Sequence, residues 1–447
     1  LTGAMGMGFP DETLYQGIAL KPDFIACDTG STDSGPFYLG SSQPKLSRRA
    51  VHHDLRRLLS ARHRLGVPLI IGSCGTSGTD DGVNWVKDML LETVRKERMP
   101  LRLGLIYSEQ DPQKIAKAFS SGRIEDLAGA PSINRESILS CSHIVAMMGH
   151  EPIVKALEDG CEVVLCGRAS DTALFAAYPM MKSFPPGPVW HCGKTVECGA
   201  VCTTLPASGG VFARIDDSGF TVEPLSEEAA CTPMSIAAHT LYENADPYLF
   251  CEPAGTLDTR DSTYTACSER ITRVEGSAFH GERYTLKLEG ATLRGYQTVV
   301  IGGIRDPYII RGADSWRDGM MGHFSQRVKE LTGLEEGREV NIEVSFYGRN
   351  AVMGKIEPLK DQLAHELGIL FTVTAPEQSI ATDIARFVTH AGSHWSIPEW
   401  KGFISGIAFP FSPPEIERGP VYRFVLNHVL IPDSPLAPFR YAKEEVR

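Results

Sequence analysis

The chain has 447 residues, of which 42% are hydrophobic and 22% charged, and its formal net charge is −11. This composition excludes a disordered chain, and the length allows two or three domains with large cores. The net negative charge argues against binding to nucleic acid or to an anionic membrane surface. The lack of a long apolar run argues against a membrane-spanning helix.

Eleven cysteines are scattered along the chain, without a CxxC pair or a Cys/His cluster of zinc-like spacing. Cysteines that lack the regular spacing of a disulfide framework are typical of proteins in a reducing compartment. We therefore expect a cytoplasmic protein in which most cysteines are small buried side chains.

The first part of the chain alternates between strand-like and helix-like segments. Strands are predicted at residues 24–26, 67–71, 101–107, 143–148 and 162–166. Helices are predicted at residues 11–20, 45–66, 83–96, 114–120, 153–159 and 171–177. Ser47 and Gly66 are expected to cap the second of these helices, and Asp80 or Asp81 the third. The alternation predicts an α/β fold, with a doubly wound, mostly parallel sheet over residues 1–185.

A proline-rich break at residues 185–188 precedes a different pattern. Strands are predicted at residues 210–216, 220–224, 270–275, 284–289, 298–301 and 340–347, and helices at residues 315–331 and 376–390. The alternation within residues 284–289 is typical of a half-exposed antiparallel strand. We expect residues 186–447 to form a second, α+β domain.

Loops rich in small, hydroxylated and acidic residues follow several predicted strands, beginning with residues 27–35. Parallel strands end at one edge of a sheet, so these loops can converge there. Amides, hydroxyls and an arginine in such loops favour binding of a carboxylate or phosphate. The substrate-binding candidates are Ser31, Thr32, Ser73, Cys74, Gly75, Arg168 and Ser170. No loop has the P-loop pattern, so ATP chemistry is not favoured.

Ionisable side chains at the same loops indicate acid–base chemistry. The catalytic candidates are Asp28, Asp33, His150 and Asp171. Carboxyl groups crowded at one sheet edge acquire separated pKa values, which supplies both an acid and a base. The same carboxylates could hold Mg²⁺ or another divalent cation, and a protein without a cofactor is the alternative.

Cysteine catalysis is a further alternative. Residues 25–30 faintly resemble the Cys-Asn-Thr loop of two-cysteine amino-acid racemases. Cys27 would then act as a thiolate, with Cys74 or Cys166 as its partner.

Several motifs, taken together and in order, resemble the acyclic terpene utilisation AtuA-like family, formerly a domain of unknown function. They are residues 27–36, 38–40, 167–171, 193–194, 197–199, 252–253 and 303–307. The resemblance implies catabolism of citronellol- or geraniol-type compounds through carboxylic acids or acyl-CoA. It also implies a small AtuA-related domain as a separate partner, and it carries no catalytic assignment.

The leading hypothesis is a lyase, and within that class a hydratase or dehydratase of a small unsaturated carboxylate or CoA ester. A cysteine-based isomerase or racemase is the first alternative. A non-catalytic ligand-binding subunit that requires a partner chain is the second. We expect a homo-oligomer.

Overall fold

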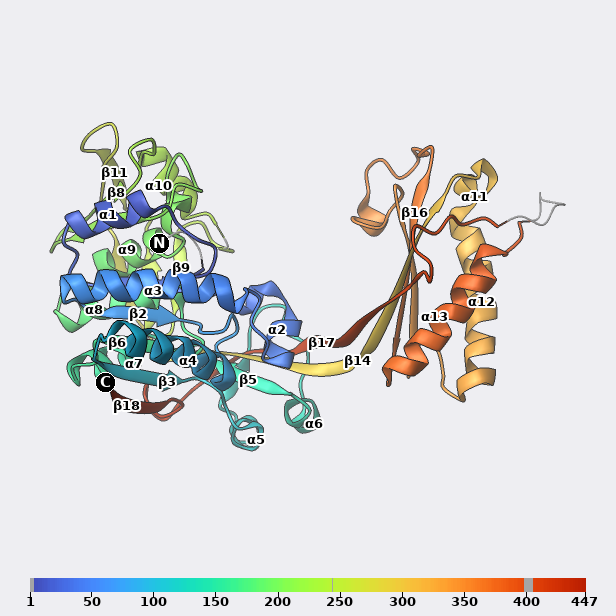
Figure 1. The fold of residues 1–447 in the computed structure, drawn as a ribbon, viewed down its shortest axis with the longest axis horizontal. Helices are drawn as coiled ribbons and strands as arrows, with labels where there is room; N and C mark the ends of the chain where they lie inside the picture. Colours follow the sequence, from blue (N-terminus) through green and yellow to red (C-terminus); the bar gives the residue numbers. More distant parts are fainter. Residues whose placement is uncertain (1–3, 243, 398–404) are drawn as a thin grey trace. The chain divides into compact units, whose positions relative to one another are not determined.

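The computed structural model describes residues 4–242, 244–397 and 405–447. The chain divides into two compact units, whose helices and strands are labelled in Figure 1. Unit 1 is Leu1–Thr292 with Phe424–Arg447, and unit 2 is Leu293–Arg423. No helix among the described residues is long and apolar enough to cross a bilayer.

The central sheet of unit 1 confirms the predicted mostly parallel arrangement. In spatial order its strands are β1 (Ile25–Asp28), β2 (Leu69–Gly72), β6 (Val163–Cys166), β3 (Leu101–Tyr107) and β18 (Arg440–Val446). The first four are parallel, and β18 is antiparallel to β3. The carboxyl ends of the four parallel strands therefore share one edge.

Helices cover both faces of this sheet, as a doubly wound fold requires. The two pairs of covering helices are α3 (Arg48–Leu65) with α4 (Asp80–Glu97), and α7 (Glu151–Glu158) with α8 (Asp171–Met181). Leu69 and Ile71 of β2 belong to the core of α3 and α4, whereas Ile70 belongs to the core of α7 and α8. The period-2 alternation of a strand thus divides its side chains between two apolar layers.

Local capping signals were predicted correctly at one helix and wrongly at another. The Ser47 hydroxyl accepts a bond from the Ala50 amide, and Gly66 ends α3 with φ +70°. The predicted cap of α4 at Asp80 or Asp81 is wrong, because the Thr79 hydroxyl accepts from the Gly82 amide and Asp80 already lies inside the helix.

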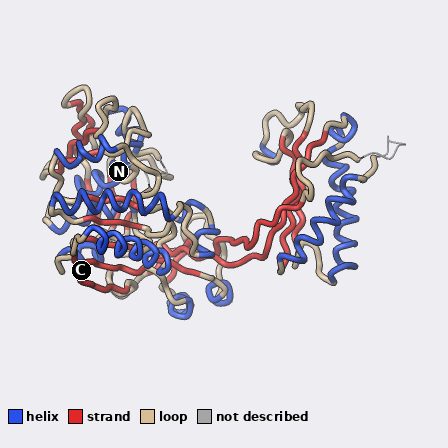
Figure 2. The backbone as a smooth tube through the Cα atoms, in the orientation of Figure 1, coloured by secondary structure: helices blue, strands red, loops and turns tan. Residues whose placement is uncertain are grey.

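Further elements complete unit 1, and Figure 2 distinguishes the helices, strands and loops of the backbone by colour. The remaining helices are α1 (Asp11–Ala19), α2 (Pro36–Ser41), α5 (Pro112–Ser120), α6 (Arg135–Leu139), α9 (Pro186–Val196) and α10 (Pro233–His239), with 3-10 turns at Thr32–Ser34 and Gly199–Cys202. One antiparallel sheet contains β7 (Val211–Ile215), β8 (Gly219–Pro224), β12 (Thr272–Glu275) and β11 (Thr263–Ala266). A smaller one contains β9 (Leu249–Glu252), β10 (Gly255–Asp258) and β13 (Ala278–Gly281).

The boundary predicted near residue 185 lies inside unit 1. Prolines at the first turn of a helix are compatible with helical geometry, so the proline-rich segment starts α9 rather than ending a domain. Residues 187–196 of α9 are buried. They pack against α8 and the antiparallel strands, which joins the two predicted parts into one core.

The strand predicted at residues 143–148 does not join the parallel sheet. Strand β5 (His143–Ala146) instead pairs antiparallel with β14 (Leu286–Ile304), with Ala146 opposite Leu288. The outer edge of β3 is occupied by β18, so no position is left there for β5. The short strand β4 (Ile124–Asp126) pairs similarly with β17 (Glu415–Leu430).

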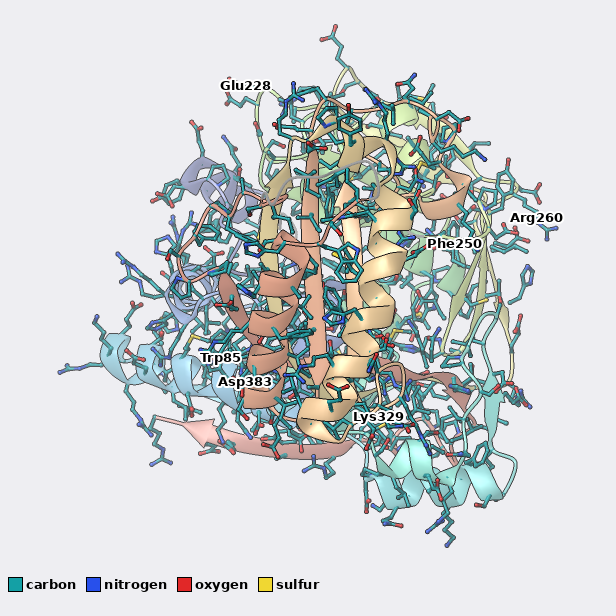
Figure 3. The ribbon with its side chains drawn as sticks, turned by 90° about the vertical axis from the view of Figure 1, so that its right-hand side faces the viewer. Trp85, Glu228, Phe250, Arg260, Lys329 and Asp383 are labelled. Atoms are coloured by element: carbon teal, nitrogen blue, oxygen red, sulfur yellow. The ribbon has the colours of Figure 1, made fainter. Side chains whose placement is uncertain are left out.

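Unit 2 is an antiparallel sheet covered by helices, as the α+β prediction requires. Its strands follow the order β15 (Asn341–Tyr347), β16 (Leu367–Ala375), β14 and β17. Its helices are α11 (Pro307–Arg311), α12 (Ala313–Thr332) and α13 (Gln378–Ser393), with a 3-10 turn at Gly354–Ile356. Figure 3 looks onto α12 and α13, with Lys329 and Asp383 at their surface. Phe324 and Phe371 form part of the core between helices and sheet.

Candidate functional site

Two loops at the carboxyl edge of the parallel sheet are hydrogen-bonded to each other. The amides of Ser73 and Cys74 donate to the carbonyls of Gly167 and Cys166, both at 3.0 Å. The Arg168 amide donates to the Gly78 carbonyl at 3.2 Å. The loop after β2 and the loop after β6 therefore form one rigid wall.

Close packing of this wall requires glycine and strained backbone. A Cβ on Gly78 would lie 2.1 Å from the Arg168 amide nitrogen, and Gly78 has φ +68°. Ser73 and Thr76 also adopt positive φ, at 46° and 82°. Side-chain-bearing residues rarely adopt this region, and such strain is concentrated at functional sites.

Arg168 is the central charge of the site and is only 5% exposed. Its Nε donates to Glu289 Oε2 at 3.0 Å, and its Nη1 donates to the Ser73 hydroxyl at 3.2 Å. The other oxygen of Glu289 accepts from the Thr32 hydroxyl at 2.7 Å and lies 2.8 Å from Lys287 Nζ. Burial alone would raise the pKa of Glu289, but the charges of Arg168 and Lys287 outweigh it and hold that pKa at about 2.

Glu289 was not predicted as a site residue. The alternation in residues 284–289 assigns it to a solvent-facing position, yet it is 4% exposed. The prediction of a half-exposed strand is wrong here because Arg168 and Thr32 cover that face of β14. An acidic residue in an alternating strand was the only signal, and the neighbouring sequence indicates no partner for it.

Asp28 and Asp171 form the most perturbed carboxyl pair of the site. Burial raises the pKa of Asp28 to about 7; the charge of Glu197 also raises it, whereas the Gly30 amide and Arg168 lower it. Burial and the charge of Asp28 raise the pKa of Asp171 well above its usual value, against Arg168, whose Nη1 lies 3.7 Å from Asp171 Oδ1. The Oδ1 atoms of both aspartates are buried without a hydrogen-bond partner among the described residues.

A second group of polar side chains adjoins this pair. Lys194 pairs with Glu197, which also accepts from the Thr172 hydroxyl at 2.6 Å. The Ser170 hydroxyl donates to Glu252 at 2.6 Å, and burial raises the pKa of Glu252 to about 7. In the sequence, Lys194, Glu197 and Glu252 stand out only as parts of family motifs, because they lie far along the chain from the strand-end loops.

The remaining catalytic candidates lie at the margin of this cluster. Asp33 is exposed and accepts from the Ser31 hydroxyl at 3.0 Å, and its charge acts on Arg168. His150 lies in a neighbouring loop, which is joined to Arg168 by a bond from the Met148 amide to the Arg168 carbonyl.

The surroundings of His150 differ from those of the aspartate pair. Its Nδ1 lies 3.5 Å from Glu151 Oε1, and its ring packs edge-on against Trp190. Burial lowers the pKa of His150, and Glu151 opposes that effect. No contact in the described part of the chain joins His150 to Asp28 or Asp171.

The predicted thiol and amide groups are engaged in structural contacts. The Cys74 thiol is buried and donates to the Ile71 carbonyl at 3.7 Å, and its amide is bonded to Cys166. Burial raises the pKa of Cys27 to about 12 and that of Cys74 well above the usual thiol value. Both shifts oppose thiolate formation. Gly75 forms a tight turn with φ +71°, where a Cβ would lie 2.4 Å from the Gly82 Cα.

Metal binding was considered for the same carboxylates. Within residues 4–242, 244–397 and 405–447, no three side chains of His, Cys, Asp or Glu gather in a way that could hold a metal ion. The Mg²⁺ hypothesis therefore remains a prediction without a ligand set in this part of the chain.

Comparison with known proteins gave one finding. The family model described as "Acyclic terpene utilisation family protein AtuA" matches residues 48–396. No curated protein and no solved structure matches the chain. The matched range includes Arg168, Asp171, Glu197, Glu252 and Glu289.

Proposed function

Because the chain belongs to the acyclic terpene utilisation AtuA family, we propose that it is a catabolic lyase that hydrates or dehydrates an unsaturated carboxylic acid or its thioester. The observation that carries the proposal is the Asp28–Asp171 pair beside Arg168. Each carboxyl has a pKa that burial raises and that the positive charge of Arg168 lowers. Such a pair favours one neutral and one ionised carboxyl near neutral pH.

One neutral and one charged carboxyl supply the two proton transfers of a hydration. The ionised carboxyl takes a proton from water as the water oxygen bonds to the β-carbon of the substrate. The π electrons of the double bond move to the α-carbon, which takes its proton from the neutral carboxyl. Water has then been added across the double bond, and the pair has exchanged its proton between the two aspartates.

Arg168 gives the site its charge preference. Glu289, Ser73 and the Ala169 carbonyl fix the guanidinium, so its position is set before a substrate enters. Its charge keeps one aspartate ionised and favours an anionic group nearby. Within this proposal, Arg168 and Ser73 are positioning residues, whereas Asp28 and Asp171 are catalytic.

A substrate panel in D₂O tests the proposal. Crotonyl-CoA, 3-methylcrotonyl-CoA and the CoA thioester of 3,7-dimethylocta-2,6-dienoic acid are incubated with the protein, and products are analysed by mass spectrometry. A hydratase adds D₂O to at least one of them, and Asp28→Asn and Asp171→Asn each slow the addition at least 100-fold. Asp81→Asn, an exposed aspartate of α4, is the matched control and keeps full turnover.

Two other results would contradict the proposal. Binding of a thioester without any deuterium uptake would favour the non-catalytic subunit. Turnover that persists in both aspartate variants would remove the pair from the mechanism. The raised pKa values of Cys27 and Cys74 give the cysteine-based isomerase no comparable support.

A further inference from the structure

A third carboxyl group adjoins the aspartate pair and takes no part in the proposed hydration. Glu252 is the last residue of β9 and is partly exposed. The Thr285 amide donates to the Pro253 carbonyl at 3.0 Å, which fastens the end of β9 to β14. A Cβ on Gly149 would lie 3.3 Å from the Cβ of Pro253, so the loop after β5 packs against the same turn. Contacts to two segments far along the chain therefore hold the end of β9 in place.

Both residues that flank Asp171 contact Glu252. The Ser170 hydroxyl donates to Glu252 Oε2 at 2.6 Å, and Ser170 is only 5% exposed. The Thr172 hydroxyl, which donates to Glu197 at 2.6 Å, lies within hydrogen-bond reach of Glu252 as well. The carboxyl groups of Asp171 and Glu252 therefore belong to one cluster that is linked by hydroxyl groups.

The surroundings of Glu252 place its titration near neutral pH. Burial and the charge of Glu197 raise the pKa of Glu252 to about 7, against the two hydroxyl groups and the charge of Lys194. Tyr284 also lies within range, since burial, Glu151 and Glu252 all raise the pKa of Tyr284. A carboxyl group that titrates near pH 7 both accepts and releases a proton readily at that pH.

The proposed hydration leaves the proton of the aspartate pair on the other carboxyl group. Before the next turnover, the aspartate that took a proton from water must release it, and the second aspartate must regain one. The Asp171 side chain is 30% exposed, and this exposed part is the part that a substrate can contact. A bound substrate or product therefore covers the direct route from Asp171 to water, whereas Glu252 adjoins the residues on both sides of Asp171 within the protein.

We propose that Glu252 exchanges a proton with Asp171 and so restores the aspartate pair between turnovers. When Asp171 holds the surplus proton, that proton passes to the Glu252 carboxylate and from there to water or buffer, while Asp28 takes one proton from water. When Asp28 holds it, each transfer runs in reverse. Only O–H bonds form and break, and the three carboxyl groups carry the same number of protons before and after each cycle. The inference rests on the proposed function and makes Glu252 a positioning residue, because it acts on the substrate only through Asp171.

The dependence of turnover on buffer concentration tests this role. With a thioester that the wild type hydrates, Glu252→Gln should lower kcat about tenfold or more in dilute buffer. Its kcat/KM should stay within about twofold of the wild-type value, because the restoring step follows the chemistry. Added imidazole should raise kcat toward the wild-type value, because a small buffer molecule replaces the missing proton carrier. Glu158→Gln, an exposed glutamate at the end of α7, is the matched control and keeps its kcat in dilute buffer.

Three results would overturn the assignment. An unchanged kcat of Glu252→Gln in dilute buffer would show that Glu252 carries no proton during turnover. Equal losses in kcat and kcat/KM would place Glu252 in the chemical step itself. A loss of kcat that imidazole does not restore would assign Glu252 a structural role only. If Glu252→Gln does not fold, Ser170→Ala removes the hydroxyl bond to Glu252 and should show the same rescue by imidazole.

Infrared difference spectroscopy tests Glu252 without turnover. Protein is labelled with a heavy carbon isotope in the glutamate side-chain carboxyl, so that glutamate bands are distinguished from those of Asp28 and Asp171. A label-sensitive band of a protonated carboxyl should disappear as the pH rises through about 7 in the wild type and in Glu158→Gln, and it should be missing from Glu252→Gln. Absence of the band in the wild type would overturn the proton exchange whether or not a thioester is hydrated. The band without any hydration would refute the proposed hydratase and still support proton exchange at Glu252.

Discussion

Replacing Glu289 by glutamine removes one negative charge from the centre of the site without changing the size of the side chain. Arg168 would then remain buried opposite a neutral amide, while Ser73 and the Ala169 carbonyl still hold its Nη1. Leaving one partner of a buried ion pair without its counter-charge usually costs about 3–5 kcal/mol. We therefore expect Glu289→Gln to destabilise the protein strongly, although it only replaces a carboxylate by an amide of the same size.

The lowered pKa of Glu289 gives a second value for the stability that its negative charge contributes. Its pKa is about 2 in the folded protein against 4.5 when unperturbed, a difference that corresponds to about 3 kcal/mol at neutral pH. Because the folded pKa is depressed, this contribution is present above about pH 4.5 and is lost as the pH falls toward 2. At pH 3 roughly half or less of it remains.

Urea unfolding followed by circular dichroism measures the effect at pH 7 and pH 3. Glu289→Gln should lower the free energy of unfolding by about 3 kcal/mol at pH 7 and by less than half of that at pH 3. Glu125→Gln is the control, because its ion pair with Arg283 is about half exposed and should change stability by roughly 0.5 kcal/mol. Equal effects of the two variants, or a Glu289→Gln effect that does not depend on pH, would refute the reasoning.

Three other variants probe the site. Asp28→Asn should be more stable than the wild type at pH 8, because a carboxyl whose pKa is raised to about 7 lowers the stability of the wild type as the pH rises from about 4 to 7. Thermal unfolding should show that the difference in stability between the two proteins disappears below about pH 4. Gly78→Ala should lower the stability measured by thermal unfolding by about 2 kcal/mol or more. Gly122→Ala is the control: Gly122 has φ +69° and open space at its Cβ, so this variant should lose only the cost of the backbone conformation. Equal losses of stability in the two variants would contradict the close packing of Gly78 on Arg168. The double variant Cys27→Ser, Cys74→Ser should keep its turnover, and a folded but inactive protein would return the thiols to the mechanism.

Local patterns in the sequence were sufficient to predict much of the parallel sheet. The predicted strand at residues 101–107 matches β3, and Ser47 and Gly66 cap α3 as expected. These features depend on neighbouring residues, through alternation, helical periodicity and side-chain capping. Asp28, Arg168 and Asp171 could be named for a similar reason, since each follows a strand whose end is visible in the sequence.

Pairings between distant segments could not be predicted. Strand β18 comes from the end of the chain and takes the edge of β3, which leaves β5 to pair with β14. Glu289 lies 121 positions from Arg168, and nothing near it indicates that an arginine will cover its face of the strand. The prolines that begin α9 were interpreted as a domain break, because the burial of that helix depends on strands that follow it.

The pH dependence of kcat/KM tests the central claim most directly, since it reports the apparent pKa values of the free enzyme. With a thioester that is turned over, the wild type should show a limb near pH 7 that belongs to the Asp28–Asp171 pair. In Asp28→Asn, kcat/KM should fall at least 100-fold and the residual activity should lose that limb. A limb near pH 7 that persists unchanged in Asp28→Asn would contradict acid–base catalysis by this pair.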